Sequence, residues 1–539
     1  MLTLLSFLLP VSIPTPPPLL AQSTPHQYVY EPQEVRPLPG QLDEVPVFNS
    51  NSPEVVQQEG ILLSTFPPDG MRVPSAHLDY AFEGRFDLFI HHIAKGQTPE
   101  DVRTLFLGVL VHNPSDETVT VEVSQAVSYL SQEAPFYDLP SYVADTTGRA
   151  FAGPGSRTTT DILRGVDQGF LPDRFRLPPG STQLLFSAPI PLRSLQEFQQ
   201  GMPLPLFVDP ATEAGLDAAE ATSDNPLAPT RPVRPRGRDI PINGRTALVY
   251  LDSNGPINVA SLGMFSRVLP DGREIPPSTE DWIRLLQQGD LAGPRDVPPT
   301  PPNQRTSSRR FYYGRVAGVA QGSLWSTRLT DDSDSEHLSI PEAGQSISYA
   351  ISTVDRNTLG TGQIQSAPIL ARYPDTAYRA HGNYGIHYQI EMPLRNNTDR
   401  TQQVAVLFQT PLKDETLQGR GLRFMRPPLD RVFYRGTLRI RYTNDWGAEQ
   451  TRYVHVVQRR GQEGEPLVTL SLRPGEERDV EVEFLYPPDA TPPQALTIET
   501  LAPTIIPRPN PDEGYPTLSN QPGTPTSLEP HPTGNRPRQ

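Results

Sequence analysis

The sequence predicts a mainly β protein: two immunoglobulin-like antiparallel β-sandwiches, an irregular β-rich middle region with one short helix, and disordered ends. Prolines (64) and glycines (39) are too frequent for long helices, yet apolar residues (36%) are common enough for folded cores. Short apolar stretches alternate with polar residues at the period of a β-strand. The same two-strand pattern also occurs near both ends of the chain. These observations indicate β domains joined by proline-rich segments.

Residues 1–21 are typical of a signal peptide. Leu2 to Ile13 form an apolar run that is too short to cross a bilayer as a helix, and a cleavage site is expected before Gln22. No lysine or arginine precedes the run, which a truncated or misplaced start codon would explain; a buried N-terminal strand is the alternative to a signal peptide. We expect export to the periplasm, the outer surface or the medium.

The first predicted sandwich spans residues 77–205. Apolar residues of one parity precede an Asn-Pro-Ser-Asp turn at 113–116 and continue after it, which predicts a hairpin with one buried face. These residues are Leu105, Leu107, Val109 and Val111 before the turn, and Val119, Val121 and Val123 after it.

The second predicted sandwich spans residues 365–502 and repeats this pattern. Aligning Asn113 with Asn396 matches the two apolar ladders, and both copies carry a Pro-Gly pair before a later strand, ending at Gly180 and Gly475. The later strands are out of step by one residue when the glycines are aligned. We interpret the copies as related modules, with chance alternation as the alternative. The matching apolar residues are Tyr388, Ile390, Met392, Leu394, Val404 and Val406.

The segments outside the sandwiches are less regular. Residues 22–76 are predicted to form an extended N-terminal segment with a short helix from Ser52 to Gly60, because proline follows the serine and glycine ends the run. Residues 206–245 form a linker that is acidic at first and then rich in arginine and proline. Residues 246–364 form the β-rich middle region.

Within the middle region, residues 246–265 predict two strands around a Ser-Asn-Gly-Pro turn. A helix is predicted over 279–288, because Ser278 and Asp281 have the spacing of a capping box and an apolar stripe follows. Residues 503–539 are rich in proline, asparagine and glycine, and we expect them to be disordered.

The charge and the lack of cysteine exclude several classes of function. A net charge of −15 repels nucleic-acid phosphates, so we expect no nucleic-acid partner. A chain without cysteine has no disulfide, thiolate nucleophile or cysteine zinc site. The sequence also lacks the motifs of a P-loop, a dinucleotide-binding turn and a serine nucleophile. After the leader we expect no transmembrane segment.

An acidic run at 331–336 is the candidate metal site. Its alternating carboxylates Asp332, Asp334 and Glu336 are oxygen ligands of the kind that Ca²⁺ prefers, but His337 stands where an EF-hand requires glycine. A solvated acidic loop is the alternative. We expect no other cofactor.

A stretch rich in tyrosine and glycine is the candidate recognition surface. Tyrosines on a glycine-punctuated loop can stack on sugars or peptides, and tyrosines that cover the edge of a sandwich are the alternative. Two histidines in this stretch are close enough in sequence to meet across a turn. The candidate binding residues are Tyr373, Asp375, Tyr378, His381, Tyr384 and His387.

Four blocks of sequence, in one order, resemble a known family. They are PLPGQLDEVPVFNSNSPEVVQQEGILLSTFPP, HLDYAFEGRFDLFIHHIAKG, SNGPINVASLGMF and ARYPDTAYRAHGNYGIHYQ. They resemble an exported cyanobacterial family that is catalogued only as a domain of unknown function, and the likeness covers roughly 30–505. The resemblance implies a cyanobacterial source and a place in the envelope or outside the cell. It supplies no activity and no catalytic residues.

These observations favour a non-enzymatic extracytoplasmic protein that serves as a structural or binding element of the cell envelope. Its partners would be envelope polysaccharide or envelope protein. The alternative is a hydrolase of envelope or extracellular glycan that uses two carboxylates about 5 to 9 Å apart in a cleft. A third hypothesis is a partner or carrier in secretion or in surface-layer assembly.

Overall fold

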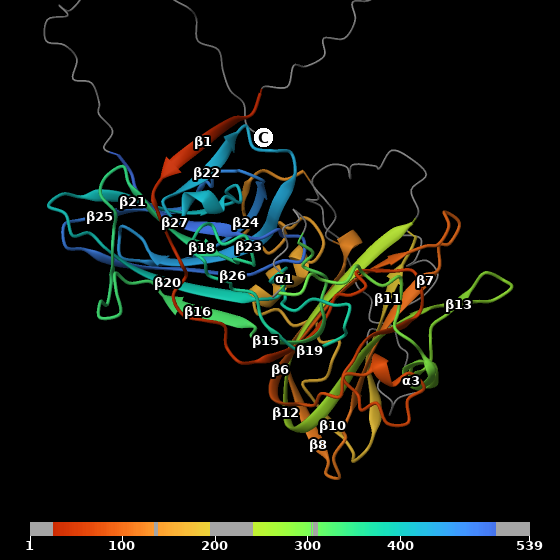
Figure 1. Cartoon of the computed structure of the whole chain (residues 1–539). Helices are drawn as coiled ribbons and strands as arrows, with labels where there is room; N and C mark the ends of the chain where they lie inside the picture. Colours follow the sequence, from red (N-terminus) through yellow and green to blue (C-terminus); the bar gives the residue numbers. More distant parts are fainter. Residues whose placement is uncertain (1–24, 134–137, 194–240, 303, 305–310, 503–539) are drawn as a thin grey trace, which may run out of the picture. The chain divides into compact units, whose positions relative to one another are not determined.

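The computed structural model confirms the predicted mainly β fold (Figure 1). The predicted signal peptide, most of the predicted linker and the predicted disordered tail lie outside the described residues. The structure describes residues 25–133, 138–193, 241–302, 304 and 311–502.

Three larger sheets and two small ones contain the strands of the described part. The largest sheet has eleven strands: β3 (Pro46–Ser50), β4 (Val55–Val56), β5 (Gly60–Ser64), β6 (Phe82–Lys95), β7 (Thr104–His112), β8 (Val119–Leu130), β10 (Arg174–Leu177), β11 (Thr182–Pro191), β12 (Ile242–Phe265), β15 (Ala317–Gln321) and β19 (Ile369–Arg372). We refer to this sheet as the first module.

The second module consists of two sheets. The seven-stranded sheet contains β9 (Tyr142–Ala144), β16 (Leu324–Arg328), β17 (Leu338–Ser339), β20 (His387–Arg395), β23 (Val432–Thr443), β24 (Glu449–Arg459) and β26 (Glu477–Leu485). The five-stranded sheet contains β2 (Glu34–Arg36), β18 (Ser346–Ile351), β21 (Gln402–Gln409), β25 (Pro466–Leu472) and β27 (Gln494–Thr500). The two-stranded sheets are β1 (Gln27–Pro32) with β22 (Gly421–Arg426), and β13 (Arg267–Val268) with β14 (Glu274–Ile275).

The described residues contain two α-helices, of which one was predicted. Helix α3 (Thr279–Gln288) has the expected bounds and the complete Ser278–Asp281 capping box. Helix α1 (Ser156–Leu163) was missed, because its three consecutive threonines have low helix propensity. Short 3₁₀ turns form η1 (Pro74–Ala76), η2 (Ser131–Glu133) and η3 (Glu415–Leu417).

The helix predicted from Ser52 to Gly60 is wrong. Two strands, β4 and β5, occupy its second half. Val55 and Val56 pair in parallel with Ile93 and Ala94 of β6, and the Val56 side chain is fully buried. The β-branched side chains therefore pack in a sheet, and this packing overrides the local helix signals.

Strand β12 differs from the predicted pair of strands because it is one 24-residue strand. Its first half pairs with β6 and β8, and its second half pairs with β5 and β7. The change occurs after Ser253, where the pairing with β6 skips to Ile257. The Ser-Asn-Gly-Pro sequence is thus an irregularity that bends one strand between two layers of the first module.

The two predicted hairpins are also wrong as pairings. Strand β7 pairs with β11 and β12, whereas β8, which follows the turn at Asn113, pairs with β10 and β12. In the second module β20 pairs with β26, while β21, which follows the turn at Asn396, pairs with β25 and β27 in the other sheet. Each turn therefore forms an arch between two strands that do not pair with each other. In the first module these strands pair with different halves of β12, and in the second module they belong to different sheets.

The predicted repeat is visible in the strand registers. Val109 faces Phe186 in the first module and Met392 faces Val480 in the second, while Gly180 and Gly475 each lie two residues before the equivalent strand. A β-bulge between Leu184 and Phe186 inserts one residue into β11. This bulge accounts for the one-residue offset in the sequence alignment.

The apolar ladders form the inner walls of two separate cores. Leu105, Leu107 and Val109 are almost fully buried in the core of the first module. Tyr388 and Ile390 are fully buried in the core of the second module, together with their partners from β26. Strand β20 largely keeps the predicted parity, whereas β7 is buried on both faces, because Phe106 and Leu110 pack in a second core cluster. The prediction of a single buried face is therefore wrong for β7.

Candidate functional site

The main candidate site is a cavity of about 580 Å³ that contains residues from several distant segments. Its volume is in the usual range for small-molecule pockets, roughly 300–1,000 Å³. The lining residues are Asn49, Asn51, Glu54, Asp296, Val297, Tyr312, Tyr313, Gly314, Arg315, Val316, Val354, Ala380, His381, Gly382, Asn383, Tyr384, Lys413, Ala490, Thr491 and Pro492.

One wall is built on strand β3 and the residues that follow it. Asn49 pairs with Gly318 of β15 on one side and with Phe89 of β6 on the other. The backbone NH of Asn51 donates to the carbonyl of Val316 at 2.8 Å. Because both neighbours of β3 are in register, the two asparagines have fixed positions at the cavity.

Arg315 connects the two carboxylates that line the cavity. Its guanidinium forms an ion pair with Glu54, and its Nη1 lies 3.5 Å from Oδ1 of Asp296. Asp296 also accepts a hydrogen bond of 2.7 Å from the Ser52 hydroxyl. The guanidinium of Arg315 therefore lies between the two carboxylates. Each carboxylate has at least one polar contact that holds its position.

An aromatic wall stands at the edge of the cavity. The Tyr313 ring packs edge-on against His381, with centroids 4.6 Å apart, and the Tyr313 hydroxyl donates to the carbonyl of Asp355. Tyr312 is 45% exposed, and its backbone is held by two hydrogen bonds to Thr300. The Tyr312 side chain is therefore free to contact a ligand, while its backbone is fixed.

Four lining residues carry buried polar atoms that have no hydrogen-bond partner among the described residues. Such atoms are uncommon in folded proteins, where most buried polar groups are paired. Asn383 is fully buried, and only its Nδ2 is satisfied, by a 2.7 Å hydrogen bond to Ser352. The four atoms are Oδ1 of Asn49, Oδ1 of Asn51, Nδ1 of His381 and Oδ1 of Asn383.

His381 is neutral at physiological pH. Burial, with a contribution from the charge of Arg379, lowers its pKa to about 4. Its Nε2 lies 3.8 Å from Oδ2 of Asp355. A neutral imidazole offers one donor and one acceptor, so His381 suits a polar, uncharged group of a ligand.

The cavity includes two of the six predicted binding residues, His381 and Tyr384. Tyr373 is instead a core residue: its hydroxyl donates to the carbonyl of Ala76 at 2.8 Å and accepts from the NH of Ser64. Tyrosine in this stretch therefore has two roles, in the core and at the cavity.

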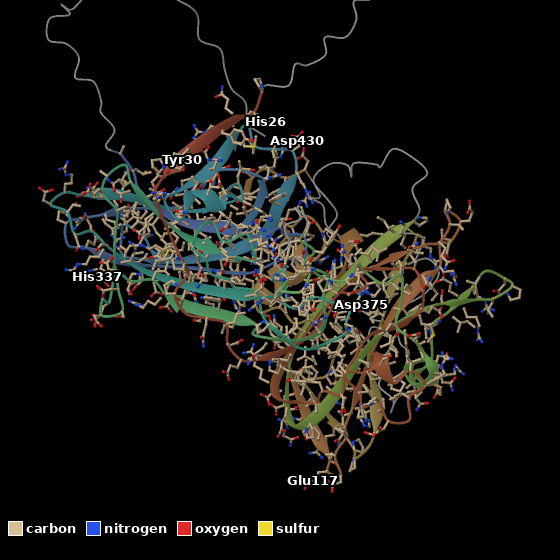
Figure 2. All side chains as sticks on the ribbon, viewed as in Figure 1. His26, Tyr30, Glu117, His337, Asp375 and Asp430 are labelled. Carbon is tan, nitrogen blue, oxygen red and sulfur yellow. The ribbon has the colours of Figure 1, made fainter. Side chains whose placement is uncertain are left out.

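Asp375 and Tyr378 do not belong to the cavity lining, and each contacts an arginine. Asp375, labelled in Figure 2, forms a two-pronged ion pair with Arg295 at 2.8 and 2.9 Å, and this hydrogen bonding lowers the pKa of the carboxyl. The guanidinium of Arg372 lies 3.7 Å from the ring centroid of Tyr378. Both contacts stabilise the loop that follows β19.

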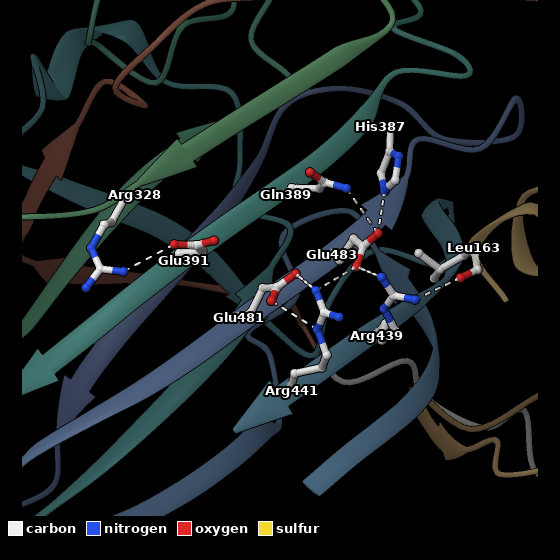
Figure 3. A network of polar contacts seen from close by, with 9 residues as sticks. All are labelled: Leu163, Arg328, His387, Gln389, Glu391, Arg439, Arg441, Glu481 and Glu483. Atoms are coloured by element: carbon white, nitrogen blue, oxygen red, sulfur yellow. Dashed lines mark hydrogen bonds and ion pairs between the residues drawn. The ribbon is translucent and has the colours of Figure 1, made fainter. Parts of the chain in front are cut away.

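His387 belongs to a different polar network, on strand β20 (Figure 3). Its Nε2 lies 2.7 Å from Oε1 of Glu483, which also binds Arg439. Burial opposes ionisation of Glu483, but the hydrogen bond and charge of His387 and the charge of Arg439 lower its pKa overall. The dashed lines in Figure 3 show that Glu483 is the centre of this network.

The predicted calcium ligands lie in a loop that His337 follows (Figure 2). Asp332 accepts hydrogen bonds of 2.9 Å from the backbone NH of Asp334 and from the Ser335 hydroxyl. Within the described residues, no group of three or more histidine or acidic side chains is placed to hold a metal ion. Calcium binding by Asp332, Asp334 and Glu336 stays a prediction.

The residues that sequence reasoning missed are Glu54, Asp296, Arg315 and Lys413. They come from segments that are far apart in the chain, and none of them belongs to a local motif. The rarity of lysine is a signal that could have selected Lys413, because the chain has only one other, Lys95.

The sequence from 33 to 500 matches the family model described as "Protein of unknown function (DUF3370)". The chain belongs to this family. The resemblance to a family of unknown function is thereby confirmed over nearly the whole chain. No curated protein matches the chain. Within the described residues, neither α-helix has the length and apolar composition needed to cross a membrane.

A search of solved structures returned "Crystal structure of Lac15 from a marine microbial metagenome". The identity is 12%, and the match covers 84% of this chain and 62% of that chain. The TM-score is 0.09, which carries no argument for a shared fold.

Proposed function

We propose that this DUF3370 protein is a non-enzymatic, extracytoplasmic binding protein of the cell envelope, and that its cavity binds envelope polysaccharide. The observation that carries the proposal is the combination of one exposed ring, Tyr312, and one partly buried ring, Tyr313, with buried, unpartnered amide oxygens in one cavity. Sugars present apolar ring faces that stack on tyrosine and hydroxyls that donate to amide oxygens.

The composition of the cavity fits a polar ligand with several hydroxyl groups. Tyr312 and Tyr313 supply aromatic faces, and the asparagines supply acceptors that are already desolvated. A ligand that satisfies these acceptors removes the cost of leaving a buried polar atom unpaired, about 1–3 kcal/mol for each group. The cavity thus favours a hydroxyl-rich ligand over a purely apolar one.

A glycan hydrolase is the second candidate, because Glu54 and Asp296 line the same cavity. Glycosidases need two carboxyls with open space between them for the scissile bond. Here the guanidinium of Arg315 contacts both carboxylates and lies between them. This arrangement favours binding over hydrolysis.

The saccharide proposal is tested by calorimetric titration with oligosaccharides released from envelope polysaccharide. We compare Tyr312→Ala with Tyr28→Ala, a matched control that removes a 71% exposed tyrosine of β1 outside the cavity. Loss of one stacking contact worth about 0.5–1.5 kcal/mol weakens binding about 2- to 10-fold in the Tyr312 variant only. Equal affinity of both variants and the wild type would exclude the cavity as the binding site.

The location is tested separately, by fractionating cells and sequencing the mature N-terminus. The leader at 1–21 supports export, so the expected product begins at Gln22 in the periplasm, on the surface or in the medium. An uncut chain in the cytosol contradicts this part of the proposal.

We also propose that the two modules are immunoglobulin-like sandwiches of common origin. The support is the shared order of four strands: β7, β8, β10 and β11 in the first module, and β20, β21, β25 and β26 in the second. In each set the outer two strands pair with one another and the inner two pair with one another. Shared arches and registers in a distant member of the family would test this origin.

A further inference from the structure

Three cations surround one aromatic ring beside the cavity. The centroid of the Phe433 ring lies 5.7 Å from Nζ of Lys413 and 5.6 and 5.8 Å from the guanidinium carbons of Arg431 and Arg460. Phe433 itself is buried, whereas both arginines are exposed. We call Lys413, Arg431 and Arg460 the cation cluster.

None of the three cations has a carboxylate partner among the described residues. The acids closest in sequence are already engaged, since Asp414 pairs with Arg423 at 2.7 Å and Asp430 lies 3.6 Å from Arg459. Like charges this close repel one another, and the Phe433 ring offsets only part of this cost. An uncompensated positive cluster is notable in a chain with a net charge of −15.

Lys413 links the cluster to the cavity. Its side chain is half-buried and lines the cavity. Burial, together with the charges of Arg460 and Arg431, lowers its pKa to about 8. A ligand in the cavity can therefore place an anionic group against Lys413 and extend toward the exposed arginines.

We propose that the cation cluster binds the anionic groups of an acidic saccharide, one that carries carboxylates or sulfate esters, whose sugar rings occupy the cavity. This inference rests on the proposed saccharide binding and adds the charge class of the ligand. Guanidinium groups bind carboxylate and sulfate oxygens with two parallel hydrogen bonds, and an ammonium adds a compact charge. The cluster supplies both kinds of donor, and its lysine lines the cavity.

The experiment is a calorimetric comparison of four probes at low ionic strength. They are a trisaccharide of galacturonic acid, the matching neutral trisaccharide of galactose, a sulfated galactose trisaccharide, and inorganic phosphate. Wild-type protein is expected to bind either acidic trisaccharide more tightly than the neutral one, and added salt should reduce the difference. The acidic probe that binds more tightly identifies the anionic group as carboxylate or sulfate.

The variants Lys413→Met and Arg431→Gln/Arg460→Gln remove the cluster, and Arg459→Gln is the control. Arg459 is exposed, adjoins Arg460 in sequence and pairs with Asp430, so its loss leaves the cluster intact. Each lost charge contact is worth about a 2- to 5-fold loss of affinity for the acidic trisaccharides, with no change for the neutral one. Circular dichroism checks that every variant is folded.

Two results overturn the inference in different ways. If acidic and neutral trisaccharides bind equally well to the wild type and to the variants, saccharide binding survives and the charge class is wrong. If neither kind of trisaccharide binds, while phosphate alone binds in a cluster-dependent way, the cluster is a simple oxyanion site. In that case the proposed saccharide function also fails.

Discussion

Asn113 and Asn396 make the same set of hydrogen bonds in the two modules. Each is fully buried, and each Oδ1 accepts from the backbone NH and the hydroxyl of the residue two positions later, at 2.9 and 2.7 Å. Each Nδ2 donates to the carbonyl four positions later, at 2.6 and 2.8 Å. Each Nδ2 also donates to an equivalent leucine carbonyl, of Leu177 or Leu472. One side chain therefore closes each arch and ties it to the neighbouring strand.

The first prediction concerns these arches. Asn396→Ala removes the side-chain donor to the carbonyl of Leu472 and the acceptor of the Thr398 backbone NH, and an unsatisfied buried polar group costs about 1–3 kcal/mol. We expect the free energy of unfolding to fall by about 2–3 kcal/mol in urea titrations. The exposed neighbour Asn397→Ala is the control, with a change under about 0.5 kcal/mol. Equal effects of the two substitutions would show that the arch is not held by Asn396.

The second prediction concerns Gly108, which lies on β7 beneath helix α3. A Cβ atom at this position would meet the indole of Trp282 at 2.6 Å, which is too close for any side chain. We expect Gly108→Ala to destabilise the protein by about 1–3 kcal/mol, the usual cost of overpacking a core. At Gly263 the nearest atom to an added Cβ is 3.6 Å away, so Gly263→Ala is the matched control.

The midpoint of thermal unfolding measures the effects of Gly108→Ala and of its control, Gly263→Ala. The double variant Gly108→Ala/Trp282→Leu should recover part of the loss relative to the sum of the single substitutions, because the smaller side chain makes room for the new methyl group. Simple additivity of the two changes would show that the indole is not the group that opposes a side chain at Gly108.

The third prediction concerns pH and two buried histidines. Burial lowers the pKa of His91 to about 4, with a contribution from the charge of Arg315, and lowers that of His92 to about 3. An unfolded histidine has a pKa of about 6.5, so below this pH the unfolded chain binds more protons than the native one. Stability is therefore full above about pH 6.5 and falls as the pH drops toward 4.

The expected slope is about 1.4 kcal/mol per pH unit for each histidine in this window. His92→Gln should reduce the slope by about that amount, because glutamine can still bond to Ser50 and to the carbonyl of Pro53 without titrating. His337→Gln, in an exposed loop, is the control. Urea titrations between pH 4 and 7 measure the pH dependence of the free energy of unfolding for both variants. An unchanged slope in His92→Gln would falsify the claim that burial lowers the pKa of His92.

The fourth prediction concerns Lys413. Its pKa of about 8 means that the ammonium loses its proton as the pH rises from 7 to 9. Affinity for an acidic trisaccharide should fall over this range by about 2- to 5-fold, the worth of one charge contact. Lys413→Arg keeps its charge and should abolish the decrease. The charges that act on Lys413 are those of Arg431 and Arg460. The other charged and titratable residues that line the cavity are Glu54, Asp296, Tyr312, Tyr313, Arg315, His381 and Tyr384.

The sequence is sufficient to predict the apolar ladders but not their pairing. Alternation of Leu105, Leu107 and Val109 fixes which side chains face the core, because a strand has a period of two. A turn such as the one at Asn113 has the same residues whether the next strand lies beside it or in another layer. Only long-range contacts decide between a hairpin and an arch, so the predicted hairpins were wrong.

The candidate site was only partly predictable for a similar reason. His381 and Tyr384 come from a stretch with a visible composition bias, so the sequence could indicate them. Glu54, Arg315 and Lys413 line one cavity although they are far apart in the sequence, and no local pattern marks them. Tertiary placement rather than residue type selects these side chains.

The most direct test of the account is a crystal structure of the protein with a bound acidic trisaccharide. We predict sugar rings in the cavity against Tyr312 and Tyr313, with a carboxylate or sulfate group within hydrogen-bonding distance of Lys413. A saccharide bound on another face of either module, with this cavity unchanged, would contradict the account.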